Sequence, residues 1–191
     1  MITQQGIVVW FTGLPCSGKT TLADKLRPKL LENNFLVVVL DGDQIRKTLS
    51  PDLGFLEQDR KENIRRIGEI SKLLVDSHII TIVSVISPLR EDRLKVRNIF
   101  EPGQFIEVYV DCPIDECERR DIKGHYKLAR RGELPNFTGV SSPYYPPINP
   151  EIHLQTHINN PKECTDKIVA YLLTNKYFSL KELTGTNEKM S

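Results

Sequence analysis

The residues most suited to chemistry form a phosphate-binding motif early in the sequence. Residues 13–20 read GLPCSGKT and fit the pattern G-x-x-x-x-G-K-[ST], with a β-branched run before them and helical spacing after them. Glycines let backbone N–H groups converge on phosphates, and a helix start favours negative charge. We expect Lys19 to reach the β- and γ-phosphates of ATP or GTP, and the Thr20 hydroxyl to bind Mg²⁺. The residues expected to hold the nucleotide are Gly13, Leu14, Pro15, Cys16, Ser17, Gly18, Lys19, Thr20 and Thr21.

Two carboxylates and an arginine follow a second buried run. Asp41 and Asp43 flank a glycine, and Arg46 comes three residues later. In a phosphoryl transfer, one carboxylate can position Mg²⁺ while the other accepts the proton of an attacking hydroxyl. A D-G turn with solvated charges fits the same residues, so the segment alone leaves both interpretations open.

Three further side chains are candidates for binding an acceptor. Arg60 suits bidentate pairing with a phosphate or sulfate oxygen, and Phe55 suits stacking on a base. The charged face of a long helix would explain the run around Arg60 equally well. Ser87 either caps the following helix or turns its hydroxyl and backbone toward the acceptor.

Alternating strands and helices must position these residues. Short β-branched runs predict buried strands, and periodic Leu and Ile spacing predicts helices between them. This alternation predicts an α/β fold with a doubly wound, mainly parallel sheet, helices on both faces, and ligands at the carboxyl ends of the strands. Strands are expected at residues 6–12, 35–40, 79–86, 105–111 and 152–158, and helices at residues 20–33, 57–77, 87–98, 113–120 and 161–173.

Residues 121–149 differ from the rest of the sequence. They are rich in Gly, Pro, Tyr, Lys and Arg, have poor periodicity and are too long for a plain connection, which predicts a mobile lid. Residues 119–131 carry six basic and one acidic residue, so positive charge is expected where nucleotides would meet. Without a repeat or linker, residues 1–175 are expected to form one domain, followed by a polar tail at residues 176–191.

The composition argues against several other classes of protein. The 191 residues include 26 basic and 25 acidic residues, and this near-neutral balance argues against binding long nucleic acid. No apolar run approaches the roughly 20 residues of a membrane span, and no signal-like start is present, so we expect a cytoplasmic protein without a membrane partner. The four cysteines form no C-x-x-C pair, so no zinc or disulfide framework is indicated. A guanine-reading N-K-x-D motif is missing, which favours a small kinase over a GTPase switch.

Several segments match motifs of one known family. They are residues 13–21, 41–46, 53–55, 59–63, 86–88, 105–112, 117–130, 137–139 and 143–144. The phosphate loop is generic, whereas the set DGD-x-[IV]-R, LGF with DR-x-x-N, and KG-x-Y with FTG is specific. On these motifs the sequence resembles the adenylylsulfate kinase (APS kinase) family of P-loop kinases, over about residues 7–173.

The resemblance implies a three-layer P-loop kinase fold and a reaction. ATP with Mg²⁺ would phosphorylate the 3′-hydroxyl of adenosine 5′-phosphosulfate, giving 3′-phosphoadenylyl sulfate for sulfate assimilation, in an enzyme expected to be a homodimer. By this match Asp43 lies near the 3′-hydroxyl, and Arg120 lies near the ATP adenine. Asp41 and Thr20 are the residues expected to bind the metal. The implied catalytic residues are Lys19, Asp41, Asp43 and Ser87. The implied acceptor contacts are Asp43, Arg46, the aromatic pair Phe55 and Phe137, Arg60, Asn63, Ile86, Ser87, Lys123 and Thr138.

Ser87 also matches a serine that family descriptions give as a phosphoserine intermediate. In-line transfer between two bound nucleotides needs positioning and charge neutralisation, and it needs no covalent step on the protein. We therefore expect Ser87 to contact the acceptor without being phosphorylated in the reaction cycle.

The sequence departs from the usual family motifs at positions around the acceptor. They are Gln44, Lys47, Thr48, His125 and Tyr145. An alternative function is therefore a 3′-hydroxyl kinase for another nucleotide with a phosphosulfate-like terminal group, such as a phosphoramidate. A nucleotide-binding module without turnover is the alternative from another class. The residues that argue against it are the intact Lys19, Asp41, Asp43 and Arg60.

Overall fold

A five-stranded parallel sheet forms the centre of the molecule. The computed structural model describes residues 4–177, in which the strands follow the order β2-β3-β1-β4-β5 and every neighbouring pair is parallel. At least one helix joins each strand to the next, so the predicted doubly wound α/β sheet is confirmed. The strands are β1 (Ile7–Thr12), β2 (Val37–Asp41), β3 (Ile80–Ser84), β4 (Phe105–Asp111) and β5 (Ile152–Gln155).

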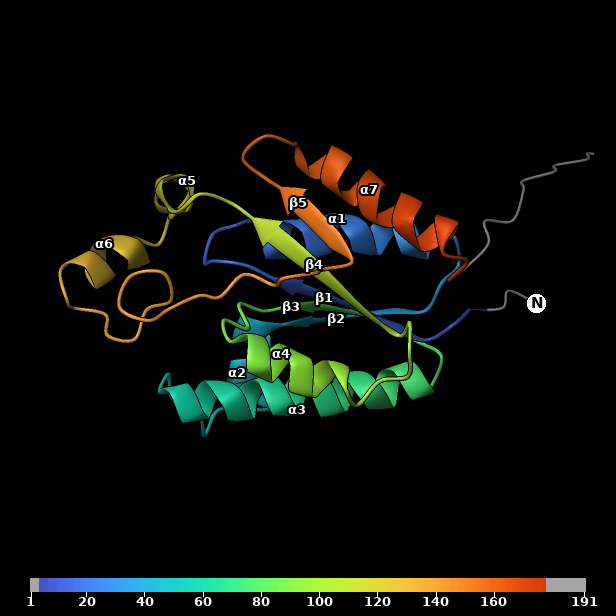
Figure 1. Ribbon diagram of the computed structural model, residues 1–191, viewed down its shortest axis with the longest axis horizontal. Coiled ribbons are helices and arrows are strands. Elements are labelled where there is room, and N and C mark those ends of the chain that lie inside the picture. The colour runs from blue at the N-terminus through green and yellow to red at the C-terminus, as the bar shows by residue number, and fades with distance from the viewer. Residues whose placement is uncertain (1–3, 178–191) are drawn as a thin grey trace, which may run out of the picture.

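Helices cover both faces of this sheet (Figure 1). Helices α1 and α7 lie on one face, whereas α3 and α4 pack together on the other. The three layers predicted for a P-loop kinase fold are therefore present. The helices are α1 (Lys19–Leu31), α2 (Gly42–Thr48), α3 (Glu57–Asp76), α4 (Arg90–Arg97), α5 (Ile114–Arg119), α6 (His125–Arg130) and α7 (Pro161–Thr174).

The central strand β1 is buried on both sides, as its uninterrupted apolar sequence predicts. Ile7, Val9 and Phe11 belong to the core formed with α1 and α7. Val8 and Trp10 alternate with them and belong to the core formed with α3 and α4. Because β1 is fixed by both cores, the loop that follows it is held on a rigid base.

The carboxyl ends of the strands gather at one edge of the sheet, and α5 and α6 lie beyond that edge (Figure 1). The predicted lid, residues 121–149, begins after α5 and contains α6. The poor periodicity of this segment does not indicate α6, because a helix of six residues is too short to show a pattern.

Several predicted element boundaries are wrong. Asp41 caps α2 by accepting a hydrogen bond from the Asp43 N–H, so the Asp-Gly-Asp sequence begins a helix that was not predicted, and the D-G turn is excluded. The third and fifth strands end earlier than expected, at Ser84 and Gln155. Helix α4 begins at Arg90, since the residue before a proline is disfavoured in a helix.

Two further expectations concern the polar tail and membrane spans. Most of the predicted tail, from residue 178 onward, lies outside the described residues. Within residues 4–177, no helix is both long and apolar enough to cross a bilayer.

Candidate active site

The phosphate loop connects β1 to α1, and its backbone requires glycine at two positions. Gly18 has φ of +105°, a conformation that side chains disfavour. A Cβ added to Gly13 would lie 2.4 Å from the carbonyl oxygen of Val110, so this position has no room for a side chain. The strand–loop–helix context that the motif needs is therefore present, and the first N–H groups of α1 face the loop.

Lys19 is buried beneath this loop. Its Nζ donates hydrogen bonds to the carbonyl oxygens of Gly13 (3.0 Å) and Leu14 (2.6 Å) and to Ser17 Oγ (3.3 Å). Burial lowers the pKa of this ammonium group to about 8, because the charged form loses hydration. A phosphate oxygen in place of one of these carbonyl groups would give the ammonium group a negatively charged hydrogen-bond partner.

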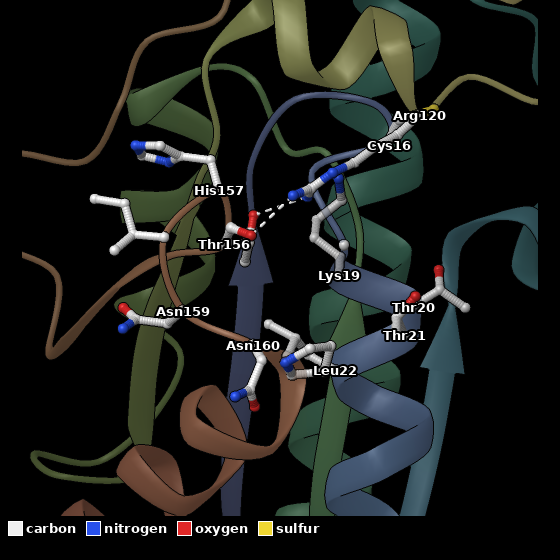
Figure 2. A pocket seen from close by; sticks show the side chains of 13 residues that line it. Cys16, Lys19, Thr20, Thr21, Leu22, Arg120, Thr156, His157, Asn159 and Asn160 are labelled. Atoms are coloured by element: carbon white, nitrogen blue, oxygen red, sulfur yellow. Dashed lines mark hydrogen bonds between the residues drawn. The ribbon is translucent and has the colours of Figure 1, made fainter.

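A pocket of about 590 Å³ lies beside the loop. Figure 2 shows the Arg120 guanidinium reaching Thr156, opposite the start of α1. Arg120 donates to Thr156 Oγ1 (3.2 Å) and to the Thr156 carbonyl (2.8 Å), while Thr156 Oγ1 donates to the Ser17 carbonyl (2.8 Å). Arg120 is thus tied to the phosphate loop through one threonine. The pocket is lined by Cys16, Gly18, Lys19, Thr20, Thr21, Leu22, Arg120, Thr156, His157, Ile158, Asn159, Asn160 and Pro161.

The wall formed by residues 156–161 is the part of this pocket that sequence reasoning missed. The predicted fifth strand, residues 152–158, extends into this wall, whereas the strand ends at Gln155. The predicted helix start at residue 161 is confirmed, and Asn160 followed by Pro161 is typical of a helix start. The structure shows Asn160 and Glu163 in a capping box at the beginning of α7.

Thr20, in the first turn of α1, and Asp41, the last residue of β2, lie together. Thr20 Oγ1 donates to Asp41 Oδ2 (3.0 Å), and the other carboxylate oxygen of Asp41 accepts the Asp43 N–H (3.0 Å). A hydroxyl and a carboxylate are hard oxygen donors, and Mg²⁺ typically takes one or two such protein ligands together with phosphate oxygens. The donor set therefore fits Mg²⁺, and the contact joins the phosphate loop directly to the Asp41–Asp43 segment.

Asp43 is exposed and meets the beginning of the lid segment. Lys123 Nζ lies 3.5 Å from Asp43 Oδ2, and both side chains are mostly exposed. Two residues that the resemblance placed around the acceptor hydroxyl are thus brought together from distant parts of the sequence. A carboxylate beside a mobile cation is suited to accepting a proton from a bound hydroxyl.

Arg46 and Phe55 form one side of the expected acceptor site. The guanidinium of Arg46 lies 4.4 Å from the centre of the Phe55 ring and donates to the Gly54 carbonyl (2.7 Å). The Phe55 ring is 60% exposed, which is unusual for a large apolar side chain and leaves a face free for a base.

Arg60 connects helix α3 to residues 136–138 of the predicted lid segment. It donates to the Phe55 carbonyl (2.9 Å), to Thr138 Oγ1 and to the Asn136 carbonyl. Burial lowers the pKa of the Arg60 guanidinium, and the neighbouring charge of Arg46 lowers it further. Two partly desolvated cations so close together are suited to binding an anion.

Phe137 and Asn63 occupy the same region. Phe137 packs edge-on against Tyr126, with ring centres 4.8 Å apart. Asn63 is buried on α3, and among the described residues its Oδ1 has no hydrogen-bond partner. The predicted acceptor residues therefore surround one region, although each aromatic ring packs on its own neighbour.

Ile86 and Ser87 follow β3 at the carboxyl edge of the sheet. Ser87 is 1% exposed, and its Oγ accepts a hydrogen bond from the buried indole N–H of Trp10 (3.1 Å). The Ile86 carbonyl accepts from Thr12 Oγ1 (2.8 Å). Leu89 is the residue at the N-cap of α4, so the interpretation of Ser87 as a helix cap is wrong. A buried hydroxyl bonded to an indole is poorly placed to attack phosphorus.

The basic residues of the segment 119–131 are largely ion-paired. Arg119 and Arg120 both pair with Glu116 (2.7 Å each), and Arg130 pairs with Glu118 (2.6 Å). The acidic partners lie just before the counted segment, so the sequence count overstates the free positive charge there.

Comparisons with known proteins place this geometry in a family. Residues 5–155 match the family model described as adenylylsulphate kinase. A relative from Halalkalibacterium halodurans, named a probable adenylyl-sulfate kinase, is 57% identical over 165 residues, which cover 86% of this chain and 82% of that protein.

Solved structures give the same result. The APS kinase CysC of Mycobacterium tuberculosis, in complex with AMPPNP and APS, has a TM-score of 0.85 and 42% identity, covering 89% of this chain and 99% of that one. A hexameric APS kinase from Thiobacillus denitrificans has a TM-score of 0.71 and 30% identity, covering 93% of this chain and 31% of that one. The family model, the sequence relative and the superposed folds agree, and the chain belongs to the adenylylsulphate kinase family.

Proposed function

We propose that this chain transfers the γ-phosphoryl group of ATP to the 3′-hydroxyl of adenosine 5′-phosphosulfate, giving 3′-phosphoadenylyl sulfate and ADP. The hydrogen bond between Thr20 and Asp41 is the observation that carries the assignment of residues. It joins the phosphate loop to the segment that bears Asp43, so the donor phosphate and the acceptor hydroxyl have one meeting point.

The donor side is built from the phosphate loop and α1. The loop N–H groups and the start of α1 bind the phosphates, and Lys19 turns from the loop carbonyls toward the transferred group. Thr20 and Asp41 would hold Mg²⁺, and the bound ion would supply positive charge to neutralise the phosphates. The pocket between Arg120, Thr156 and α1 takes the adenosine of ATP.

The acceptor side is built around Asp43. Its carboxylate accepts the proton of the 3′-hydroxyl, the oxygen forms a bond to the γ-phosphorus, and the bond to the ADP oxygen breaks in line. Arg46 and Arg60 bind the anionic phosphosulfate, with Asn63 buried beside them. Phe55 and Phe137 hold the adenine, and Ile86, Ser87, Lys123 and Thr138 complete the contacts.

The segment 121–149 closes over the two nucleotides as a lid within a single domain of residues 1–175. Arg60 already contacts residues 136–138, and Lys123 contacts Asp43, so both parts of the lid reach the acceptor side. Limited proteolysis within residues 121–149 is expected to slow when both nucleotides are present. A cleavage rate that is the same with and without ligands would contradict closure.

The deciding experiment is an ATP-consumption screen across nucleotide acceptors, with the position of phosphorylation determined on the product. We expect turnover with adenosine 5′-phosphosulfate and phosphate on its 3′-oxygen. Turnover only with a phosphoramidate nucleotide would transfer the assignment to that acceptor, and binding of ATP without turnover on any acceptor would indicate a non-catalytic module. Asp43→Asn serves as the inactive control, because it keeps the size of the side chain and removes the base.

We propose further that the enzyme is a cytoplasmic homodimer. Four free cysteines, three of them buried, are typical of a reducing compartment. A known APS kinase of related fold is hexameric, so self-association occurs in this family. Light scattering on the purified protein measures the mass directly, and a monomer at micromolar concentration would contradict the dimer.

A further inference from the structure

Arg93 is a buried arginine on α4 that does not line the pocket beside the phosphate loop. Its side chain is 3% exposed. Nε donates to Glu107 Oε1 on β4 (2.6 Å), one terminal nitrogen donates to the Ser87 carbonyl (2.6 Å), and the other donates to the Tyr145 carbonyl (2.8 Å). One planar guanidinium therefore connects a central strand, the turn after β3 and the segment that follows the lid helix.

The turn that Arg93 holds is strained. Ser87 has φ of +38°, where a residue with a side chain is unfavourable, and such a conformation persists only when its surroundings fix it. Trp10 holds the Ser87 hydroxyl (3.1 Å), and Arg93 holds the carbonyl of the same residue. The peptide that faces the acceptor is thus fixed on two sides by buried groups.

The segment at residues 143–146 is attached to the same turn. The Tyr145 N–H donates to the Pro88 carbonyl (2.9 Å), and the Tyr144 hydroxyl lies 3.0 Å from Thr12 Oγ1 at the end of β1. Arg93 completes this attachment, because its guanidinium also lies 5.9 Å from the centre of the Tyr144 ring. The lid therefore has a fixed carboxyl-terminal end.

Arginine is required for this arrangement. Its rigid fork offers donors in three directions in one plane, whereas a lysine ammonium on a flexible stem cannot reproduce that geometry. The buried charge is balanced by Glu107, which Arg97 contacts at 3.3 Å from the next turn of α4. Arg97 otherwise pairs with Glu151 and contacts neither Ser87 nor Tyr145, so it is a natural control.

We propose that Arg93 is a positioning residue, which fixes the turn at residues 86–88 and anchors the end of the lid at residues 143–146 so that the acceptor is held in line. The inference rests on the proposed function for its kinetic part only. Arg93 acts through two backbone carbonyls, because its buried side chain donates to both of them.

The test compares three variants that disturb the same ion network differently. The double variant R93M/E107Q removes both buried charges together, which avoids leaving Glu107 unpaired. The control R97Q weakens the network without touching the two carbonyls, and E107Q alone keeps the donation from Arg93 to both. Amide hydrogen exchange on the free proteins is measured for residues 86–88 and 143–146, followed by KM for each nucleotide.

We expect faster exchange in both segments for R93M/E107Q, with exchange in R97Q and E107Q close to that of the unaltered protein. The KM for the acceptor should rise roughly tenfold, because a turn that is no longer held in its binding conformation must be ordered when the acceptor binds, while the KM for ATP changes less than about threefold. If the double variant does not fold, Arg93→Lys provides the same comparison with a smaller loss.

Three results would overturn the proposal. Unchanged exchange at residues 86–88 and 143–146 would show that Arg93 does not fix them. Equal kinetic loss in R97Q would assign the effect to the ion network as a whole. Faster exchange with an unchanged acceptor KM would remove the role in positioning. An unaltered enzyme that is inactive with adenosine 5′-phosphosulfate would refute the proposed function instead, and the exchange data would still decide whether Arg93 is the anchor.

Discussion

Binding of ATP is expected to weaken as the pH rises through about 8, because of the burial of Lys19. Its pKa of about 8 means that the amine is roughly nine-tenths protonated at pH 7 and one-tenth protonated at pH 9. A bound phosphate favours the ammonium form, so binding takes up a proton at high pH. The dissociation constant for a non-hydrolysable ATP analogue should therefore rise about tenfold between pH 7 and pH 9. A lysine with an ordinary pKa would leave it nearly constant over the same range.

Calorimetric titration at intervals of half a pH unit measures this dependence. The range lies above the last phosphate ionisation, so the ligand charge stays constant. Lys19→Met should bind weakly with no slope, whereas Lys25→Met, on the exposed side of the same helix, should keep the slope. Equal dissociation constants at pH 7 and pH 9, or a slope that survives in Lys19→Met, would refute the reasoning.

Three substitutions test other parts of the site. Asp43→Ala should lower kcat by roughly 10²–10⁴-fold with ATP affinity nearly unchanged, and a variant with undiminished kcat would remove the base assignment. Phe55→Ala should raise the acceptor KM roughly five- to 150-fold, since stacking contributes about 1–3 kcal/mol. Because the Phe55 ring is 60% exposed, the free energy of unfolding of the protein should change by less than about 0.5 kcal/mol in this variant. An unaltered acceptor KM would contradict stacking. Gly139→Ala should lower the free energy of unfolding by about 1–3 kcal/mol in urea titrations, because φ is +92° and the new Cβ would lie 2.9 Å from Leu14; wild-type stability would disprove the close approach.

The phosphate loop and the sheet could be predicted because their signals are local. A glycine-rich motif between a strand and a helix and an alternation of elements are both visible in short windows of sequence. The contact between Thr20 and Asp41 cannot be read from a short window of sequence, because β2 is separated from β1 by β3 in the sheet. It follows only when the strand order is known.

The missed features depend on contacts between distant segments. Thr156 gives no signal as a nucleotide-pocket residue, and its role is visible only through its bonds to Arg120 and Ser17. Helix α2 was missed because an Asp-Gly-Asp sequence is more typical of turns, whereas here the first aspartate caps a helix. Arg93 gives no signal in the sequence as a buried residue, because burial cannot be read from a single charged position.

The paired arginines around α5 and α6 have a consequence for the rate at which nucleotides arrive. A cluster of free cations would attract anions over a distance of about 8–10 Å or more, and added salt would slow association steeply. Here Glu116 and Glu118 offset part of the charge of Arg119, Arg120 and Arg130, so the long-range field of residues 116–131 is weaker than that of six free cations. Association should therefore depend on ionic strength less steeply than six free cations would make it, and selection between anions should take place mainly at short range.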